Sequence, residues 1–172
     1  MSPENEIIQI VDEKNRELAA VSRTIMRAQN LIHRASYVLV FNKARELYIQ
    51  RRTMNKDIYP GYWDVAAGGV VLADENYDDS ARRELREELG ICNNNLTHCF
   101  DHYYEDSNNR VWGRIYNCTH EGPFVLQAEE VEYGMFVPVQ TALAMSRQDP
   151  FTPDGLEILN RFEEARSGLL LP

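Results

Sequence analysis

Two hydrophobic patterns alternate along the chain. Short apolar or alternating runs bounded by polar turns are typical of strands, whereas apolar positions three and four residues apart are typical of helices. The sequence predicts strands at residues 7–11, 17–21, 35–41, 46–50, 63–67, 100–104, 111–118 and 133–137. It predicts helical segments at residues 22–30, 77–89, 138–145 and 153–165. Because these alternate without a linker of different composition, we expect an α/β fold in one domain over residues 1–172, with an N-terminal β-hairpin extension over residues 1–30.

The best-defined helix in the pattern is Tyr77–Leu89. Asn76 precedes it as an N-cap, and Gly90 follows it as a C-terminal stop. Gly68 and Gly69 follow the strand predicted at residues 63–67, and we expect them to end that strand and to place backbone carbonyls near the helix.

This helix carries three glutamates on one side. At 100° per residue, they fall within an arc of about 100°, so we expect their carboxylates to converge on one patch. The three are Glu84, Glu87 and Glu88. Arg83 lies one turn before Glu87 and is placed to hold it. A solvated, salt-bridged helix face is one interpretation; binding of a hard divalent cation such as Mg²⁺ or Mn²⁺, which relieves the repulsion, is the other.

The composition narrows the possible partners. The chain has 18 basic and 27 acidic residues, for a net charge of −9. Such a surface repels phosphate backbones, which argues against a polynucleotide partner but not against a small anion. Three cysteines without a C-x-x-C pair are typical of a reduced intracellular protein. No leader and no apolar run of roughly 20 residues is apparent, so we expect a cytoplasmic protein with no membrane partner.

The segment from Gly69 to Ile91 follows the pattern G-x5-E-x7-R-E-U-x-E-E-x-G-U, in which U is bulky and apolar. Every specified position is filled: Gly69, Glu75, Arg83, Glu84, Leu85, Glu87, Glu88, Gly90 and Ile91. Average residue frequencies put a chance match on the order of one in ten million. Residues 69–91 therefore resemble the Nudix box of the Nudix hydrolases. The resemblance implies an α/β/α sandwich with a mixed β-sheet, and hydrolysis of nucleoside diphosphates linked to another moiety.

The same resemblance implies roles for individual residues. Metal ligands are expected at Glu84, Glu87, Glu88 and the carbonyl of Gly68. Glu75 is expected to pack the loop before the helix and Arg83 to orient the glutamates, while Gly69 and Gly90 are structural. For the general base, Glu87 or Glu88 is the first choice, and an acid of the segment 129–132 is the alternative.

A second resemblance concerns the residues before the box. The segments Arg51–Lys56 and Tyr59–Trp63 are similar to isopentenyl diphosphate isomerase, a Nudix-fold enzyme in which the positions of Arg52 and Lys56 bind the diphosphate. The isomerase's catalytic cysteine falls on Gly68 here, so the thiol needed for allylic protonation of the substrate is missing. His33 matches one of its metal ligands, but we expect a structural, hydrogen-bonded histidine.

The sequence also resembles the YfcD-like group of Nudix hydrolases. The resemblance rests on the short strings RAQ, QRR, AGGVV, ARRE, EELGI, RVWG, GPF and FTPD. The sequence thus predicts a pyrophosphohydrolase that acts on a small-molecule diphosphate with Mg²⁺ or Mn²⁺. An isomerase-like enzyme and a non-catalytic nucleotide-sensing module are the alternatives. The assembly, monomer or homodimer, stays open.

Overall fold

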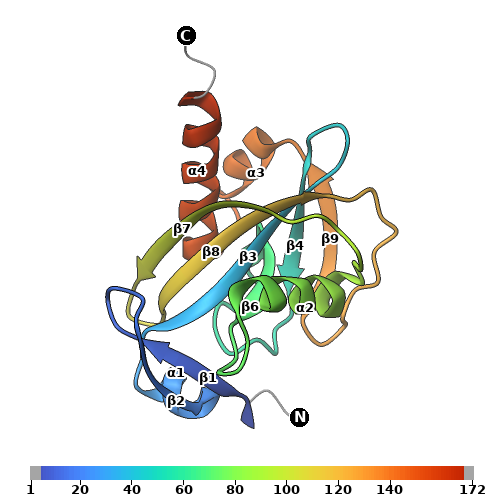
Figure 1. Ribbon diagram of the computed structural model, residues 1–172. Coiled ribbons are helices and arrows are strands. Elements are labelled where there is room, and N and C mark those ends of the chain that lie inside the picture. The colour runs from blue at the N-terminus through green and yellow to red at the C-terminus, as the bar shows by residue number, and fades with distance from the viewer. Residues whose placement is uncertain (1–4, 169–172) are drawn as a thin grey trace.

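The computed structural model describes residues 5–168. Its nine strands and four helices follow one another along the chain (Figure 1). The elements are β1 Ile7–Val11, β2 Glu17–Ser22, α1 Arg23–Ala28, β3 His33–Phe41, β4 Leu47–Arg52, β5 Trp63–Asp64, β6 Ala67–Val70, α2 Tyr77–Leu89, β7 Thr97–Glu105, β8 Arg110–Thr119, β9 Val131–Val137, α3 Val139–Met145 and α4 Pro153–Gly168. The alternation predicted from the sequence is confirmed, with strand ends shifted by a few residues.

Strand β3 is the centre of a mixed sheet. It runs parallel to β8 along its whole length, from the pair His33 and Val111 to the pair Phe41 and Thr119. Its other partners, β1, β4 and β6, are antiparallel to it. Strand β7 extends the sheet beyond β8, while β5 and β9 pair with β4.

Helices cover both faces of this sheet, which confirms the α/β/α arrangement (Figure 1). Alternate side chains of β3 point to opposite faces. Leu39 belongs to the core under α3 and α4, whereas Val38 and Val40 belong to the core under α2.

Helix α2 begins and ends where its sequence predicts. The side chain of Asn76 accepts a hydrogen bond from the Asp79 N–H at 2.9 Å. Gly90 has a φ of 69°, a left-handed conformation that glycine adopts without steric cost. Its N–H bonds the carbonyl of Arg86 at 3.1 Å, which closes the last turn.

The strand predicted at residues 63–67 is wrong in detail, because the segment forms two strands. Trp63–Asp64 pairs with β4, and the chain then crosses to pair Ala67–Val70 with β3. Gly68 and Gly69 therefore lie inside β6 instead of ending a strand. A change of pairing partner within five residues depends on the tertiary fold and leaves no local hydrophobic pattern.

The N-terminal extension packs against the end of β6. Strands β1 and β2 and helix α1 form a small apolar core with Ile8, Ile10, Met26 and Val70. The N–H of Ala73 also donates to the carbonyl of Ile7 at 2.9 Å. The extension thereby fixes the loop that joins β6 to α2.

Candidate active site

Helix α2 is joined to the sheet through Glu88. This residue is 3% exposed, and its Oε2 accepts from the N–H of Gly68 at 3.2 Å and from Nε2 of Gln50 at 3.0 Å. The last turn of α2 is thereby connected to both β6 and β4. Gln50, a buried polar residue in a strand, was not singled out from the sequence.

Arg83 gathers the other acids of the Nudix-like segment. Its Nε and Nη2 donate to the two oxygens of Glu75 at 2.8 and 2.9 Å. Its Nη1 donates to Glu84 at 2.7 Å and to Glu87 at 3.2 Å. A further bond from Nη2 to the carbonyl of Val70 measures 3.2 Å. One guanidinium therefore connects the loop, the helix and β6.

Gly69 lets Glu84 approach the backbone of β6. A Cβ built on Gly69 would overlap the carboxylate of Glu84. Only glycine leaves this space, so the carboxylate can lie directly against the strand. This contact places Glu84 beside the Gly68–Gly69 backbone.

The buried glutamates are held in an environment that opposes their charge. Burial raises the pKa of Glu84 above its ordinary value despite the neighbouring Arg83. Burial, followed by the charge of Glu84, raises the pKa of Glu88. Lys56 lowers both pKa values and Glu130 raises them, which places these two charges near the pair. An additional cation would favour the ionised forms.

The three glutamates, expected on one patch, have different partners in the structure. Glu84 and Glu87 share Arg83, whereas Glu88 faces Gly68 and Gln50. Like charges separate, and Arg83 neutralises two of them. Among residues 5–168, no three acidic, histidine or cysteine side chains are arranged to hold a metal ion.

The chemistry of the donors nevertheless fits a hard divalent cation. Two desolvated carboxylates lie against a glycine backbone, and the Oε1 of Gln50, on the amide that contacts Glu88, is buried without a partner in the described part of the chain. Carboxylate, amide and carbonyl oxygens are the ligand types that Mg²⁺ and Mn²⁺ prefer.

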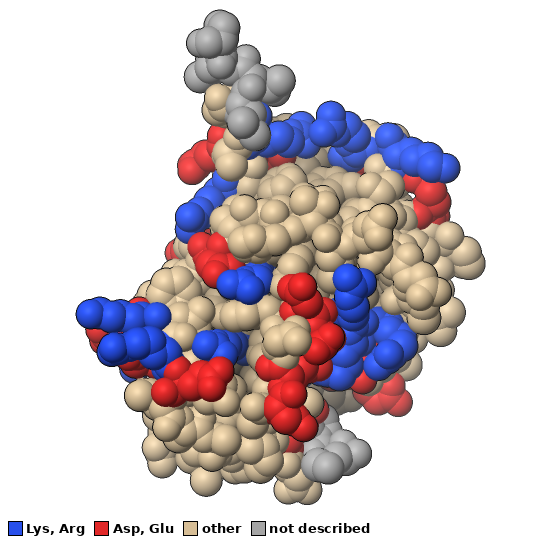
Figure 2. Space-filling model, viewed as in Figure 1, with Lys and Arg blue, Asp and Glu red and all other residues tan. Residues whose placement is uncertain are grey.

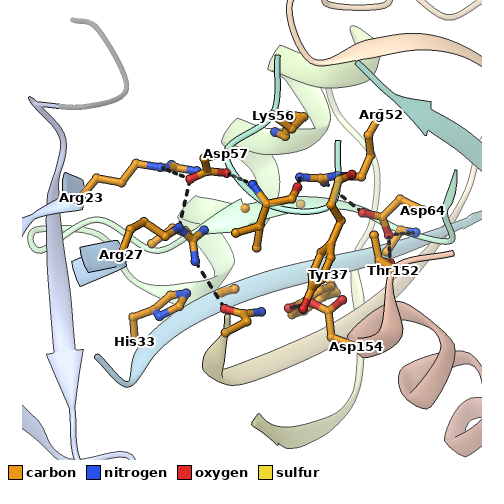
Figure 3. A pocket seen from close by; sticks show the side chains of 18 residues that line it. Arg23, Arg27, His33, Tyr37, Arg52, Lys56, Asp57, Asp64, Thr152 and Asp154 are labelled. Carbon is orange, nitrogen blue, oxygen red and sulfur yellow. Dashed lines mark hydrogen bonds and ion pairs between the residues drawn. The ribbon is translucent and has the colours of Figure 1, made fainter. Parts of the chain in front are cut away.

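A polar cavity of about 70 Å³ adjoins the glutamates at Gly68 and Gly69 (Figure 3). Its rim contains both residues predicted to bind a diphosphate, Arg52 and Lys56. Acidic and basic side chains also lie next to one another on the surface over α2 (Figure 2). The cavity is smaller than the roughly 300–1,000 Å³ of typical ligand sites, so it admits one small part of a ligand at a time.

Arg52 is partly engaged by the protein itself. It donates to the carbonyls of Ile58 and Tyr59 at 3.0 and 3.3 Å and to Asp64 at 3.2 Å. A guanidinium has five N–H donors, so two stay available for phosphate oxygens. Lys56 forms an ion pair with Glu130.

Glu130 is the acid of the segment 129–132 that lies nearest the glutamates. Its pairing with Lys56 brings it beside Glu84 and Glu88. Glu129 contributes its backbone carbonyl to Thr53, and Glu132 pairs with Arg51 at 3.6 Å on the surface.

Residues of the N-terminal extension also reach the cavity, which sequence reasoning missed. Arg23 and Arg27 of α1 each donate to Asp57 at 3.2 and 3.0 Å, and all three line the cavity (Figure 3). They hold the loop that carries Lys56. Arg27 opens the string RAQ, but the pairing with Asp57 depends on tertiary structure.

The opposite wall contains two further acids that were not singled out. Asp64 and Asp154 are 9% and 7% exposed, and Tyr37 and Thr152 lie beside them. The string FTPD contains Thr152 and Asp154 at the start of α4, and this string was the available signal in the sequence. His33 lines the cavity as well, buried and hydrogen-bonded as expected.

Comparisons with known proteins agree with this fold. Residues 31–162 match the NUDIX domain family. The chain is 42% identical to the Nudix hydrolase PA4841 of Pseudomonas aeruginosa over 160 residues, which cover 93% of this chain and 95% of that protein. It is 46% identical to the Nudix hydrolase YfcD of Escherichia coli over 154 residues, covering 90% of this chain and 84% of the other.

Among solved structures, the chain is similar in fold to DR0079 from Deinococcus radiodurans. The TM-score is 0.81 at 22% identity, and the alignment covers 91% of this chain and 98% of that one. The fold and the glutamate-rich helix thus define a hydrolase of pyrophosphate bonds. The chain belongs to the Nudix hydrolase family, whose members generally use divalent metal ions. Its relatives at 42–46% identity include the YfcD-like Nudix hydrolases. None of the helices in the described part of the chain has the length and apolar character to cross a membrane.

Proposed function

We propose that this protein hydrolyses the diphosphate linkage of a nucleoside diphosphate derivative or a related organic diphosphate with Mg²⁺ or Mn²⁺. The observation that carries the proposal is the junction between the buried glutamates and the cavity. Carboxylates suited to a cation lie beside Gly68 and Gly69, and these glycines line the same cavity as the cationic groups of Arg52 and Lys56. A diphosphate bound across this junction contacts both.

Glu84, Glu88 and the carbonyl of Gly68 would hold the metal ion, and Glu87 would join them on leaving Arg83. When bound, such an ion lowers the pKa of a coordinated water and neutralises charge that develops on the leaving phosphate. The negative charge of the protein favours a small diphosphate over a polynucleotide as substrate.

The protein's own residues then have distinct tasks. Arg52 donates its two remaining N–H groups to phosphate oxygens, and Lys56 adds a point charge once it leaves Glu130. A carboxylate accepts the proton of the attacking water. Glu87 is suited to this task because it is half exposed and reaches solvent, and Glu130 becomes suited when Lys56 turns to the substrate.

The test is product release from a panel of organic diphosphates with Mg²⁺ or Mn²⁺. We expect turnover by the wild-type protein and a loss of about 10²-fold or more in Glu87→Gln and Glu88→Gln. Glu105→Gln, which alters a surface pair with Arg110, is the control and retains activity. Comparison with Glu130→Gln separates the two candidate bases. Unchanged turnover in both helix variants, or binding without turnover across the panel, would contradict the proposal.

A further inference from the structure

One face of β3 forms the floor of the cavity. His33, Ala35 and Tyr37 alternate on this strand, and all three line the cavity. At about 3.3 Å per residue, His33 and Tyr37 lie roughly 13 Å apart along the strand. That span exceeds a single ion, so each end of the floor can contact a different small part of an organic group.

The His33 end presents a bare hydrogen-bond acceptor. His33 is 2% exposed, and its Nδ1 lies 3.0 Å from the carbonyl oxygen of Leu31. A carbonyl only accepts, so Nδ1 carries the hydrogen of the ring. Burial, followed by the charge of Arg27, lowers the pKa of His33 to about 3, so the ring is neutral. No hydrogen bond from its Nε2 to a residue of the range 5–168 is present, and the side chain lines the cavity (Figure 3).

The Tyr37 end presents carboxylates. The hydroxyl of Tyr37 donates to Oδ2 of Asp154 at 2.7 Å, and the N–H of Gly155 donates to Oδ1 at 3.0 Å. The hydroxyl of Thr152 donates to Asp64 at 3.3 Å. Asp64 forms an ion pair with Arg52, but Asp154 forms none with any described residue. Figure 3 shows these groups on the side of the cavity away from Arg23 and Arg27.

Both carboxylates have acceptor capacity left. A carboxylate has about four acceptor positions, and the protein fills two of them on Asp154. Burial, followed by the charge of Asp64, raises the pKa of Asp154 to about 6, as expected for two desolvated acids side by side. The free acceptor positions of these carboxylates attract N–H and O–H groups.

We propose that His33, Asp64 and Asp154 recognise hydrogen-bond donors on the group attached to the diphosphate. The substrate is therefore rich in N–H or O–H donors, supplied by an amino-bearing base, by sugar hydroxyls or by both. This inference rests on the proposed function, because it places the diphosphate at Arg52, Lys56 and Gly68 and the donor group against β3 and the start of α4. It makes these three side chains determinants of specificity.

The experiment compares substrates that differ by one donor. Amino-bearing bases are compared with the same bases lacking the amino group, in ADP with purine riboside diphosphate and in CDP with zebularine diphosphate, and hydroxyls are compared in each ribose form with its 2′-deoxy form. For each pair, kcat/KM with Mg²⁺ and the affinity by calorimetry are measured for the wild-type protein. We expect the donor-bearing member to be preferred by about tenfold or more. The substrates that differ in the base and those that differ in the sugar show which of the two groups supplies the donors.

Asp154→Asn and His33→Leu test the residues. Asp154→Asn replaces one acceptor with a donor of the same size, and His33→Leu removes the acceptor but keeps the apolar volume. We expect each to reduce the preference in at least one set of pairs to less than about threefold. Glu157→Gln, exposed on the same helix and paired with His102 at 3.1 Å, leaves the preference unchanged. A role of Asp154 in capping α4 alone would lower the melting temperature without changing the preference, which would overturn the inference.

The two proposals fail in different ways. Turnover of some diphosphates without any donor preference, or a preference that survives both variants, overturns this inference and leaves the hydrolase intact. Absence of turnover for every organic diphosphate overturns the proposed function. In that case the affinities measured by calorimetry still test whether His33, Asp64 and Asp154 recognise donors. Equal affinity for both members of every pair would overturn this inference.

Discussion

Arg83 and Glu75 form two parallel hydrogen bonds, from Nε to Oε1 at 2.8 Å and from Nη2 to Oε2 at 2.9 Å. The same guanidinium contacts Glu84 and Glu87, so its position determines where the helix carboxylates lie. The bidentate bond fixes the plane of the guanidinium, which a single contact would leave free to rotate.

We predict that Arg83→Lys disrupts this arrangement although the charge is kept. An ammonium cannot make the paired bonds to Glu75 and also contact both glutamates. We expect about 1–3 kcal/mol less free energy of unfolding in urea and a loss of turnover of about 10-fold or more. Arg82→Lys, at the neighbouring exposed position, is the control. Equal stability and turnover in the two variants would show that Arg83 acts only through its charge.

Gly69→Ala tests the close approach of Glu84 to β6. The added Cβ overlaps the Glu84 carboxylate, so the side chain must move away from the Gly68–Gly69 backbone. We expect weaker Mn²⁺ binding by calorimetry and a destabilisation of about 1–3 kcal/mol from overpacking. Gly168→Ala, where the Cβ meets open space, is the matched control. Wild-type affinity for Mn²⁺ in Gly69→Ala would exclude Glu84 from the metal site.

The features of the sequence that act locally predicted the structure best. Helix α2 was predicted with its limits because Asn76 and Gly90 act on the backbone next to them. The pairing of Arg83 with Glu87 followed from their spacing of four residues. The contact between Gln50 and Glu88 joins a strand to a helix 38 positions later, and no local pattern encodes it.

The residues that line the cavity also include some that local sequence patterns do not predict. Arg52 and Lys56 were placed at the site by resemblance, and the structure puts both on its rim. Asp57 was missed because its partners, Arg23 and Arg27, lie in an extension whose position depends on packing of β1 against the sheet. Buried polar walls arise where distant segments meet.

The ion pairs of Asp57 lead to a prediction about the loop between β4 and β5. Although burial raises its pKa, Arg27 and Arg23 lower the pKa of Asp57 further, so it is ionised and holds two guanidiniums. We predict that Asp57→Asn frees the loop, accelerates hydrogen exchange over residues 53–62 and raises KM more than it lowers kcat. The cost in stability is about 1–2 kcal/mol, discounted because the side chain is 36% exposed. Glu17→Gln, an exposed partner of Arg34, is the control. Unchanged hydrogen exchange over residues 53–62 in Asp57→Asn would show that the N-terminal extension does not hold this loop at the site.

Glu88 leads to a prediction about pH. Because burial and Glu84 raise its pKa above the ordinary 4.5, the folded protein keeps a proton that the unfolded chain has lost. Its favourable contribution is thus complete below about pH 4.5 and is lost as the pH rises toward the folded pKa. In urea titrations with a chelator, we expect the free energy of unfolding to fall by roughly 1–3 kcal/mol between about pH 5 and about pH 8. Glu88→Gln, which keeps an acceptor for Gln50 and Gly68, reduces this slope, whereas Glu132→Gln retains it. An undiminished slope in Glu88→Gln would assign the proton to another group.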